Sequence, residues 1–310
     1  MHAAAVTIRA PAKLNLSLAV LERRADGFHE IESLMAPVDL ADSLSVTAAG
    51  AAGIRLRVRF AAPLATPRGR VLARDVPADA TNLVVRAAAA LAAEAGLEPA
   101  LDIELVKRIP SGAGLGGGSS DAAAVLIAAA EAWGLDWSWE RLAAIGARIG
   151  SDVPWFFAGA AAIAAGRGER ILPVRALAPL FAVIACPPEG LSTAAVYRAC
   201  VPSRARAGEA AALAAALARG DLGAAGPLVH NDLEPAARGL SPDVERLLAD
   251  MARAGGICPR LTGSGSACFT LCRTLAEARG VAARLGALED AGRPRWPLVV
   301  AVRVGSGARK

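Results

Sequence analysis

The sequence predicts an α+β protein of two domains, and three observations support that fold class. Strand-like and helical runs mix without the regular β–α–β–α rhythm of a single doubly wound sheet. The chain has 310 residues, which suits one large or two ordinary domains. A stretch rich in Gly, Pro and charged residues, 166–179, separates two groups of elements. We therefore predict an N-terminal domain over 1–174 and a C-terminal domain over 175–310.

The N-terminal domain is expected to hold most of the strands. Strands are expected at 6–10, 14–20, 44–47, 54–60, 101–106 and 160–165, and helices at 82–94, 121–133 and 140–149. In 54–60, Arg55, Arg57 and Arg59 alternate with apolar residues. Such alternation predicts a half-buried strand with a solvated basic face rather than a nucleic-acid stripe. The stretch 61–80 is rich in Pro and Arg, and we expect a surface loop near the rim of the active site.

The C-terminal domain is expected to alternate helices with fewer strands. Strands are expected at 180–186, 267–272 and 298–304, and helices at 209–219, 243–254 and 275–285. The second helix carries an apolar stripe of Val244, Leu247, Leu248 and Met251 and stops at Gly255.

Composition excludes several classes of protein. Hydrophobic residues make up 54% and charged residues 20%, so a large core is expected and disorder is not. The net charge of +5 comes from scattered Arg, which suits a polyanionic ligand better than nucleic acid. Neither the five cysteines nor the three histidines have metal-ligand spacing, and buried reduced thiols are expected. Residues 1–13 lack a signal-peptide core and the apolar run 153–165 is too short to span a membrane, so we expect a cytoplasmic protein.

The stretch 110–121 carries the strongest functional signal in the chain. Five glycines precede two serines and stand between a strand-like run and an Ala-rich helical run. Glycine allows φ > 0 and lets a ligand approach the main chain. Free N–H groups at a helix start form a positive cradle for phosphate. We therefore predict a phosphate-binding loop.

Other glycine-rich motifs fit this stretch less well. Gly112, Gly114 and Gly117 match the dinucleotide pattern G-x-G-x-x-G, but no acid closes a following strand about 20 residues on. The P-loop pattern fails because no Lys follows the glycines, and the protein-kinase motifs H-R-D and D-F-G are missing from the sequence. A flexible linker stays possible, although linkers rarely stand between an apolar strand and an apolar helix.

Three further patterns carry candidate chemistry. Lys13 and Asn15 lie two residues apart on an early strand and so share a face, unless that face is simply exposed. Asp152 stands in an apolar loop, where a carboxylate needs a partner unless it caps a helix or turn. The stretch 261–267 is a second Gly/Ser loop before a strand, a pattern also common in ordinary turns.

Together these patterns resemble the GHMP kinases, which phosphorylate small molecules with ATP. The resemblance rests on Pro-x-Lys-x-Asn at 11–15, the loop at 110–120 and Leu-Thr-Gly-Ser-Gly at 261–265, and it extends from Pro11 to about Phe269. The stretches 23–31, 149–154, 166–169 and 231–235 resemble the branch whose substrate carries a cytidine diphosphate group, in the non-mevalonate route to isoprenoids. The resemblance implies a ribosomal protein S5 domain 2-like N-terminal domain and a ferredoxin-like C-terminal domain, with the active site between them.

The resemblance also implies roles for single residues. Asp152 is the expected catalytic base and Lys13 its partner, with ATP as phosphoryl donor and Mg²⁺ held through Ser119 or Ser120. The substrate is expected at Asn15, Phe28, His29, Thr193 and Tyr197. ATP is expected at Pro110, Ser111, Gly112, Ala113, Gly114, Leu115, Gly116, Gly117, Gly118, Ser119 and Ser120, with Asn82 and Lys107 beside it.

Two alternatives stay open at this point. Another GHMP kinase of the homoserine or mevalonate type would share the glycine loops but lack the Asp-Gly-Phe-His stretch at 26–29. A nucleotide-binding module without catalysis would need the loop but neither Lys13 nor Asp152. The branch usually has Tyr where this chain has Phe28, so any bond made by that phenol is lost. We expect a monomer or weak homodimer with no membrane or nucleic-acid partner.

Overall fold

The computed structural model describes residues 4–74 and 76–305, so the extreme ends of both predicted domains lie outside it. One long strand, β3 (His29–Ala48), organises the N-terminal half. Its first part pairs with β2 (Ser17–Arg23) and β6 (Ala162–Gly166), and its later part with β1 (Val6–Asn15) and β5 (Ala100–Lys107). The sheet continues through β4 (Gly53–Phe60) beside β5 and β7 (Arg170–Pro173) beside β6.

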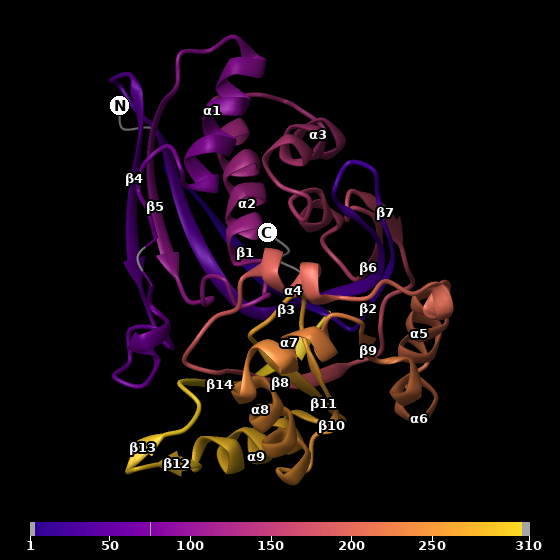
Figure 1. The fold of residues 1–310 in the computed structure, drawn as a ribbon. Coiled ribbons are helices and arrows are strands. Elements are labelled where there is room, and N and C mark those ends of the chain that lie inside the picture. Colours follow the sequence, from indigo (N-terminus) through magenta and orange to yellow (C-terminus); the bar gives the residue numbers. More distant parts are fainter. Residues whose placement is uncertain (1–3, 75, 306–310) are drawn as a thin grey trace.

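Three helices cover one side of this sheet. They are α1 (Leu83–Ala95), α2 (Gly117–Ala132) and α3 (Trp139–Ile149), which gather at the top of Figure 1. Alanines dominate the buried positions of α2, and their small side chains let it pack closely between the sheet and the other two helices. A 3₁₀ turn, η2 (Pro154–Ala158), follows α3 and places residues 150–153 beside the sheet.

The C-terminal half adds a second layer of strands and helices. Its strands run in the order β10 (Ile257–Leu261), β11 (Cys268–Cys272), β8 (Leu180–Cys186) and β14 (Leu298–Val304), and β14 meets β3 at Val304 and Val38. The helices α7 (Glu234–Leu240), α8 (Pro242–Arg253) and α9 (Leu275–Gly286) lie at the bottom of Figure 1. The remaining elements are α4 (Thr193–Ala199), α5 (Glu209–Ala218), α6 (Leu222–Ala225), the short strands β9 (His230–Asn231), β12 (Glu289–Asp290) and β13 (Arg293–Pro294), and the 3₁₀ turns η1 (Gly69–Leu72), η3 (Arg204–Arg206) and η4 (Gly226–Leu228).

Most predicted elements are present, with shifted ends, and the α+β class is confirmed. The strand expected at 44–47 is wrong in extent, because it is only the end of β3. The strand expected at 14–20 is interrupted at Leu16, whose N–H bonds back to Leu34 O across the sheet. The helices α4 and α7 and the strands β7 and β10 were not expected, since each is short and lacks clear periodicity.

The stretch 61–80 is not a simple surface loop, which corrects the expectation. Leu64 and Leu72 are buried in the core beneath β3 and β8. Arg68 reaches across to the C-terminal half, donating from Nε to Trp296 O at 2.7 Å and from Nη1 to Gly286 O at 3.0 Å. Residues 61–74 therefore tie the two halves of the molecule together.

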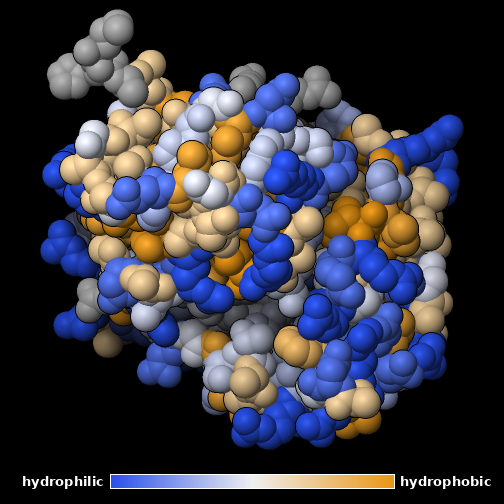
Figure 2. Space-filling view, turned by 90° about the horizontal axis from the view of Figure 1, so that it is seen from above, coloured by the Kyte–Doolittle hydropathy of each residue, from blue (hydrophilic) through white to orange (hydrophobic). Residues whose placement is uncertain are grey.

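The surface and the thiols agree with the composition. Hydrophilic residues cover much of the face in Figure 2, with hydrophobic residues in small groups between them. Arg55, Arg57 and Arg59 are exposed on β4, and Arg55 pairs with Asp102, so the solvated basic face is confirmed. All five cysteines are free thiols. Within residues 4–74 and 76–305 no helix is long and apolar enough to cross a membrane.

Candidate active site

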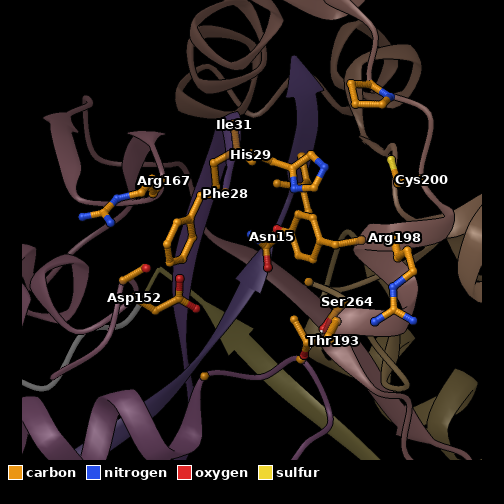
Figure 3. Close-up of a pocket in the computed structure, with 18 of the residues that line it drawn as sticks. Asn15, Phe28, His29, Ile31, Asp152, Arg167, Thr193, Arg198, Cys200 and Ser264 are labelled. Atoms are coloured by element: carbon orange, nitrogen blue, oxygen red, sulfur yellow. Dashed lines mark hydrogen bonds between the residues drawn. The ribbon is translucent and has the colours of Figure 1, made fainter. Parts of the chain in front are cut away.

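A cavity of about 860 Å³ opens between the two halves of the molecule. Its walls come from the β1 and β3 strands, the turns on either side of β6, the helix α4 and both glycine loops. In Figure 3, Asp152 and Phe28 lie on one side of this space, with His29 above and Thr193 and Ser264 below. Residues far apart in the sequence therefore face one another across one chamber.

Lys13 and Asp152 form a charged pair at the floor of the cavity. Their Nζ and Oδ2 atoms are 3.9 Å apart, and the Asp152 side chain is 37% exposed whereas that of Lys13 is buried. Burial lowers the pKa of Lys13, and the nearby Asp152 carboxylate acts in the opposite direction. Asp152 thus has the ionic partner that an acid in an apolar loop needs, and it keeps an open side toward the cavity.

A buried polar chain fixes Lys13. Its ammonium donates to Asn15 Oδ1, and Asn15 Nδ2 donates to Ser33 Oγ at 2.8 Å. Ser33 in turn donates to Ser17 O at 2.6 Å, and the Asn15 N–H donates to Thr262 Oγ1 at 3.0 Å. The expected shared face of Lys13 and Asn15 is therefore real, and it points inward, with both residues 4% exposed.

The two glycine loops pack directly against each other. A Cβ on Gly114 would lie 2.2 Å from Thr262 O, and one on Gly263 would lie 2.9 Å from Gly114 O. The first loop is also held by bonds from Lys13 N to Leu115 O and from Ala267 N to Ala113 O, at 3.0 and 3.1 Å. Part of the glycine requirement thus comes from loop packing, in addition to ligand approach.

Residues 231–234 hold the second loop in place. Asn231 Nδ2 donates to Leu261 O and Gly263 O at 2.9 and 2.8 Å, and Glu234 Oε2 accepts from Leu261 N at 2.9 Å. The Asn-Asp-Leu-Glu stretch therefore positions the second glycine loop through hydrogen bonds to the backbone of that loop.

The start of α2 stands over a buried ion cluster. Lys107 Nζ donates to Asp42 Oδ2 and to Asp121 Oδ2, the latter at 2.7 Å. All three side chains are nearly inaccessible. Asp42 also accepts from Ile109 N at 2.9 Å, which fixes the entry to the first glycine loop. Desolvation raises the pKa of Asp121, against the attraction of Lys107.

The two predicted metal-contacting serines differ in access. Ser119 is partly exposed, whereas Ser120 is buried and its Oγ has no partner among the described residues. Within those residues, no group of three or more His, Cys, Asp or Glu side chains could hold a metal. A magnesium ion bound mainly by nucleotide phosphates, with one serine oxygen, fits such a site.

The opposite end of the cavity is aromatic. Ring centroids of His29 and Tyr197 are 5.2 Å apart, and Phe28 is 49% exposed. Thr193 Oγ1 and Ser264 Oγ share a hydrogen bond of 2.8 Å, which joins α4 to the second glycine loop. Desolvation and the charge of Arg23 lower the pKa of His29 below its usual 6.5, so the ring is neutral at neutral pH.

Comparison with known proteins identifies the family. The family model described as "GHMP kinases N terminal domain" matches residues 82–160, and the one described as "GHMP kinases C terminal" matches residues 213–290. A 4-diphosphocytidyl-2-C-methyl-D-erythritol kinase of Shouchella clausii is 42% identical over 265 residues, covering 85% of this chain and 84% of that protein. One of Rhodococcus jostii is 40% identical over 285 residues, covering 90% and 88%. The chain belongs to the 4-diphosphocytidyl-2-C-methyl-D-erythritol kinase family.

Solved structures agree with this assignment. A crystal structure of 4-(cytidine 5'-diphospho)-2C-methyl-D-erythritol kinase superposes with a TM-score of 0.76 at 36% identity, covering 97% of this chain and all of that one. A homoserine kinase from Cytophaga hutchinsonii gives a TM-score of 0.73 at 20% identity, covering 98% and 95%, which shows the shared fold alone. The two-domain GHMP kinase fold expected from the sequence is confirmed.

The structure brings ten of the twenty predicted site residues of this family member to the cavity. Those that line it are Lys13, Asn15, Phe28, His29, Gly112, Gly114, Gly116, Asp152, Thr193 and Tyr197. The other ten do not line it. Eight of them belong to the first glycine loop and the start of α2, namely Pro110, Ser111, Ala113, Leu115, Gly117, Gly118, Ser119 and Ser120. The remaining two are Lys107, which is in the ion cluster, and Asn82, which caps α1 by accepting from Val84 N at 2.9 Å. Asn82 nevertheless precedes Leu83, whose Cδ1 would lie 3.5 Å from a Cβ on Gly118.

Several cavity residues were not predicted. Arg23, Arg167 and Arg198 line the wall, as do Gly263 and Ser264 of the second loop. Arg23 and Arg167 lie in stretches that carry the family resemblance, but the motifs gave these arginines no role, and Arg198 is one of many arginines scattered in the chain. Asp42 was missed because a buried carboxylate inside a strand resembles, in sequence, an ordinary polar position.

Proposed function

We propose that this chain transfers the γ-phosphoryl group of ATP to the 2-hydroxyl of 4-diphosphocytidyl-2-C-methyl-D-erythritol, a step of the non-mevalonate route to isoprenoids. One observation supports it above the others: the Lys13–Asp152 pair and the rings of Phe28, His29 and Tyr197 line a single cavity. A phosphate-transfer pair and a nucleobase pocket are both needed for this substrate. Relatives at about 40% identity carry this activity in their names.

Asp152 is the proposed general base. Its carboxylate takes the proton of the 2-hydroxyl while that oxygen forms a bond to the γ-phosphorus and the bond to the β-phosphate oxygen of ATP breaks. Lys13, 3.9 Å away, offsets charge that develops at the attacking oxygen. Asn15 orients Lys13 by accepting a hydrogen bond from its ammonium at Oδ1, which keeps the ammonium directed at the cavity floor.

The first glycine loop is proposed to hold the phosphates of ATP. Gly112, Gly114 and Gly116 have φ of +68°, +77° and +70°, and the N-terminus of α2 follows directly. This turns successive N–H groups toward one side and adds the positive end of a 16-residue helix. Mg²⁺ bound with the nucleotide would supply charge neutralisation, with Ser119 or Ser120 as its protein contact. Lys107 acts here by holding Asp42, which fixes the entry to the loop, and Asn82 is proposed to lie near the nucleotide at the start of α1.

The aromatic end is proposed to bind cytosine. Phe28 and Tyr197 offer ring faces for stacking, and neutral His29 offers one donor and one acceptor to the edge of the base. Thr193, fixed by Ser264, stands between this end and the glycine loops. A cytoplasmic location and a monomer or weak homodimer remain part of the proposal.

A substrate panel tests the proposed function. ATP consumption and the phosphorylated product are measured with the cytidylyl substrate, with homoserine and with mevalonate at equal concentration. We expect turnover with the cytidylyl substrate alone. Turnover of homoserine or mevalonate at a comparable kcat/KM would mean that the proposed substrate is wrong and that the activity is that of another branch of GHMP kinases. ATP binding without turnover of any acceptor would favour a non-catalytic module.

A further inference from the structure

Phe28 has an anchored backbone but little packing around its ring. Its N–H donates to Asp26 Oδ1 at 3.1 Å, and its carbonyl accepts from Arg24 N at 2.8 Å. The ring is 49% exposed and belongs to none of the apolar clusters of the described residues. The turn between β2 and β3 therefore fixes where the side chain starts, while apolar contacts do not fix the plane of its ring.

The Arg167 guanidinium covers one face of this ring. Its Cζ lies 4.9 Å from the ring centroid, inside the range of about 6 Å for a cation–π contact. In Figure 3, Arg167 approaches Phe28 from the side away from His29. The ring face directed toward His29 and the middle of the cavity stays free.

The fold brings these two residues together from separate turns. Ile31 of β3 pairs with Gly166 of β6, so the β6–β7 turn lies beside the β2–β3 turn. Gly166 and Gly168 have φ of +76° and +113°, and Glu169 Oε2 accepts from Arg167 N at 2.6 Å. This anchors the backbone of Arg167 on both sides and directs its side chain to Phe28.

The charge of Arg167 is available for this contact. Among the described residues Arg167 forms no ion pair within 4 Å. Arg24, in the adjacent β2–β3 turn, by contrast pairs with Asp26 and Glu30. Desolvation acts to raise the pKa of Asp26, but the Phe28 N–H, Arg24 and Arg167 together lower it. The Asp26 carboxylate that anchors the Phe28 backbone is therefore also within the influence of the Arg167 charge.

We propose that Arg167 is a positioning residue for base recognition, holding the outer face of Phe28 so that the inner face is presented to cytosine. The inference rests on the proposed function. It also explains how this chain does without the phenol that its branch usually has at this position. A hydrogen bond from a tyrosine hydroxyl could fix a ring, and here a cation on the ring face does so instead.

A double-mutant cycle on base binding tests the link. Dissociation constants for cytidine 5'-diphosphate are measured by calorimetry for the wild type, Arg167→Ala, Phe28→Leu and the double variant. We expect Arg167→Ala to weaken binding about 2- to 5-fold, the factor that corresponds to an exposed cation–π contact. In the Phe28→Leu background the same change should have no further effect, because its target ring is gone. Arg167→Lys should recover part of the loss.

Arg170→Ala is the matched control, since it removes the same charge from the same hairpin at an exposed position. KM for ATP should stay unchanged in every variant, which a general loss of folding would not allow. If the effects of Arg167→Ala and Phe28→Leu multiply, Arg167 acts on the ligand independently of the Phe28 ring and the positioning role is wrong. Absence of cytidine 5'-diphosphate binding to the wild type would also overturn it. Failure of the proposed function differs, since it shows as lack of turnover with base binding intact.

Discussion

The two ends of the cavity are built by different means. The phosphate end consists of backbone and buried polar side chains: the glycine loops lock together at Gly114 and Gly263, and Lys13 is held by a chain of hydrogen bonds. The base end consists of side chains on a turn and a short helix, with Phe28 half exposed. The first is rigid by construction, whereas the second depends on a few contacts between neighbouring side chains.

This contrast suggests a division of labour. Phosphoryl transfer needs atoms fixed in line, and backbone N–H groups and buried ions fix them with little freedom. Base recognition needs ring faces on which a flat base can stack, and the half-exposed ring of Phe28 offers one. Changes at the phosphate end should therefore affect turnover or ATP, while changes at the base end should affect only the cytidylyl substrate.

The largest expected effect is from Asp152→Asn. The variant should fold and bind ATP but lose about 10²- to 10⁴-fold in kcat, because an amide cannot accept the hydroxyl proton. Steady-state kinetics and calorimetry with a non-hydrolysable ATP analogue measure the two quantities. Asp136→Asn, an exposed acid elsewhere in the N-terminal half, is the control and should leave kcat unchanged. A near-normal kcat in Asp152→Asn would make this acid structural.

Gly118→Ala should give the next largest effect, which is a loss of affinity for ATP with no change in affinity for the cytidylyl substrate. In the protein a Cβ there would meet only Leu83 Cδ1, at 3.5 Å, so the fold accommodates it. A phosphate that contacts this backbone would be displaced, and losing one charged hydrogen bond of about 1.5–3 kcal/mol weakens ATP binding roughly 10- to 150-fold. Calorimetry with the ATP analogue measures the loss.

Gly239→Ala supplies the control for that variant. Gly239 is also helical and exposed, and a Cβ there would have no atom within 4 Å. It should leave ATP affinity unchanged. Unaltered affinity in Gly118→Ala as well would mean that the phosphates do not approach the start of α2. Gly116 is a poorer choice, because its Cβ would lie 2.9 Å from Lys13 Cγ and disturb catalysis directly.

The difference between the two ends also explains what the sequence could predict. The glycine loops are readable because positive φ and close packing require glycine at fixed positions. Lys13, Asn15 and Asp152 were found through short motifs, but their mutual distance depends on the long strand β3, most of which the sequence did not indicate. That strand contains Glu30, Glu32 and the buried Asp42, which hide its apolar pattern. The position of Arg167 depends on strand register, which no local pattern reveals.

Tyr197→Ala and His29→Ala should act at the base end only. Each should raise KM for the cytidylyl substrate, roughly 5- to 150-fold for loss of one stacking ring, and leave KM for ATP nearly unchanged. A uridylyl analogue should bind less well to the wild type by about 1–3 kcal/mol, since uracil places an acceptor where cytosine has an amine donor. Competition assays measure this preference. Equal use of the cytidylyl and uridylyl forms would mean that the aromatic end of the cavity does not recognise cytosine, and the two ends would then not differ in function as proposed.

The smallest expected effect tests the buried ions beneath the phosphate end. Burial raises the pKa of Asp121 from 3.8 to about 8. A carboxyl whose pKa is higher in the folded state than in the unfolded state stabilises the fold at low pH, and that contribution is lost as the pH rises toward 8. The amide of Asp121→Asn cannot ionise and keeps an oxygen that accepts from Lys107. The stability of the variant should therefore rise relative to that of the wild type as the pH rises. Thermal unfolding at pH 5.5 and pH 9 should give a Tm difference that grows by a few degrees in favour of the variant.

Asp102→Asn, at an exposed ion pair with Arg55, is the control. Its Tm difference from the wild type should be the same at pH 5.5 and pH 9, because the pKa of Asp102 is lowered and its carboxylate stays ionised throughout. A Tm difference for Asp121→Asn that did not change with pH would mean that Asp121 is already ionised at pH 5.5, and the phosphate end would then carry a buried negative charge beneath the ATP phosphates.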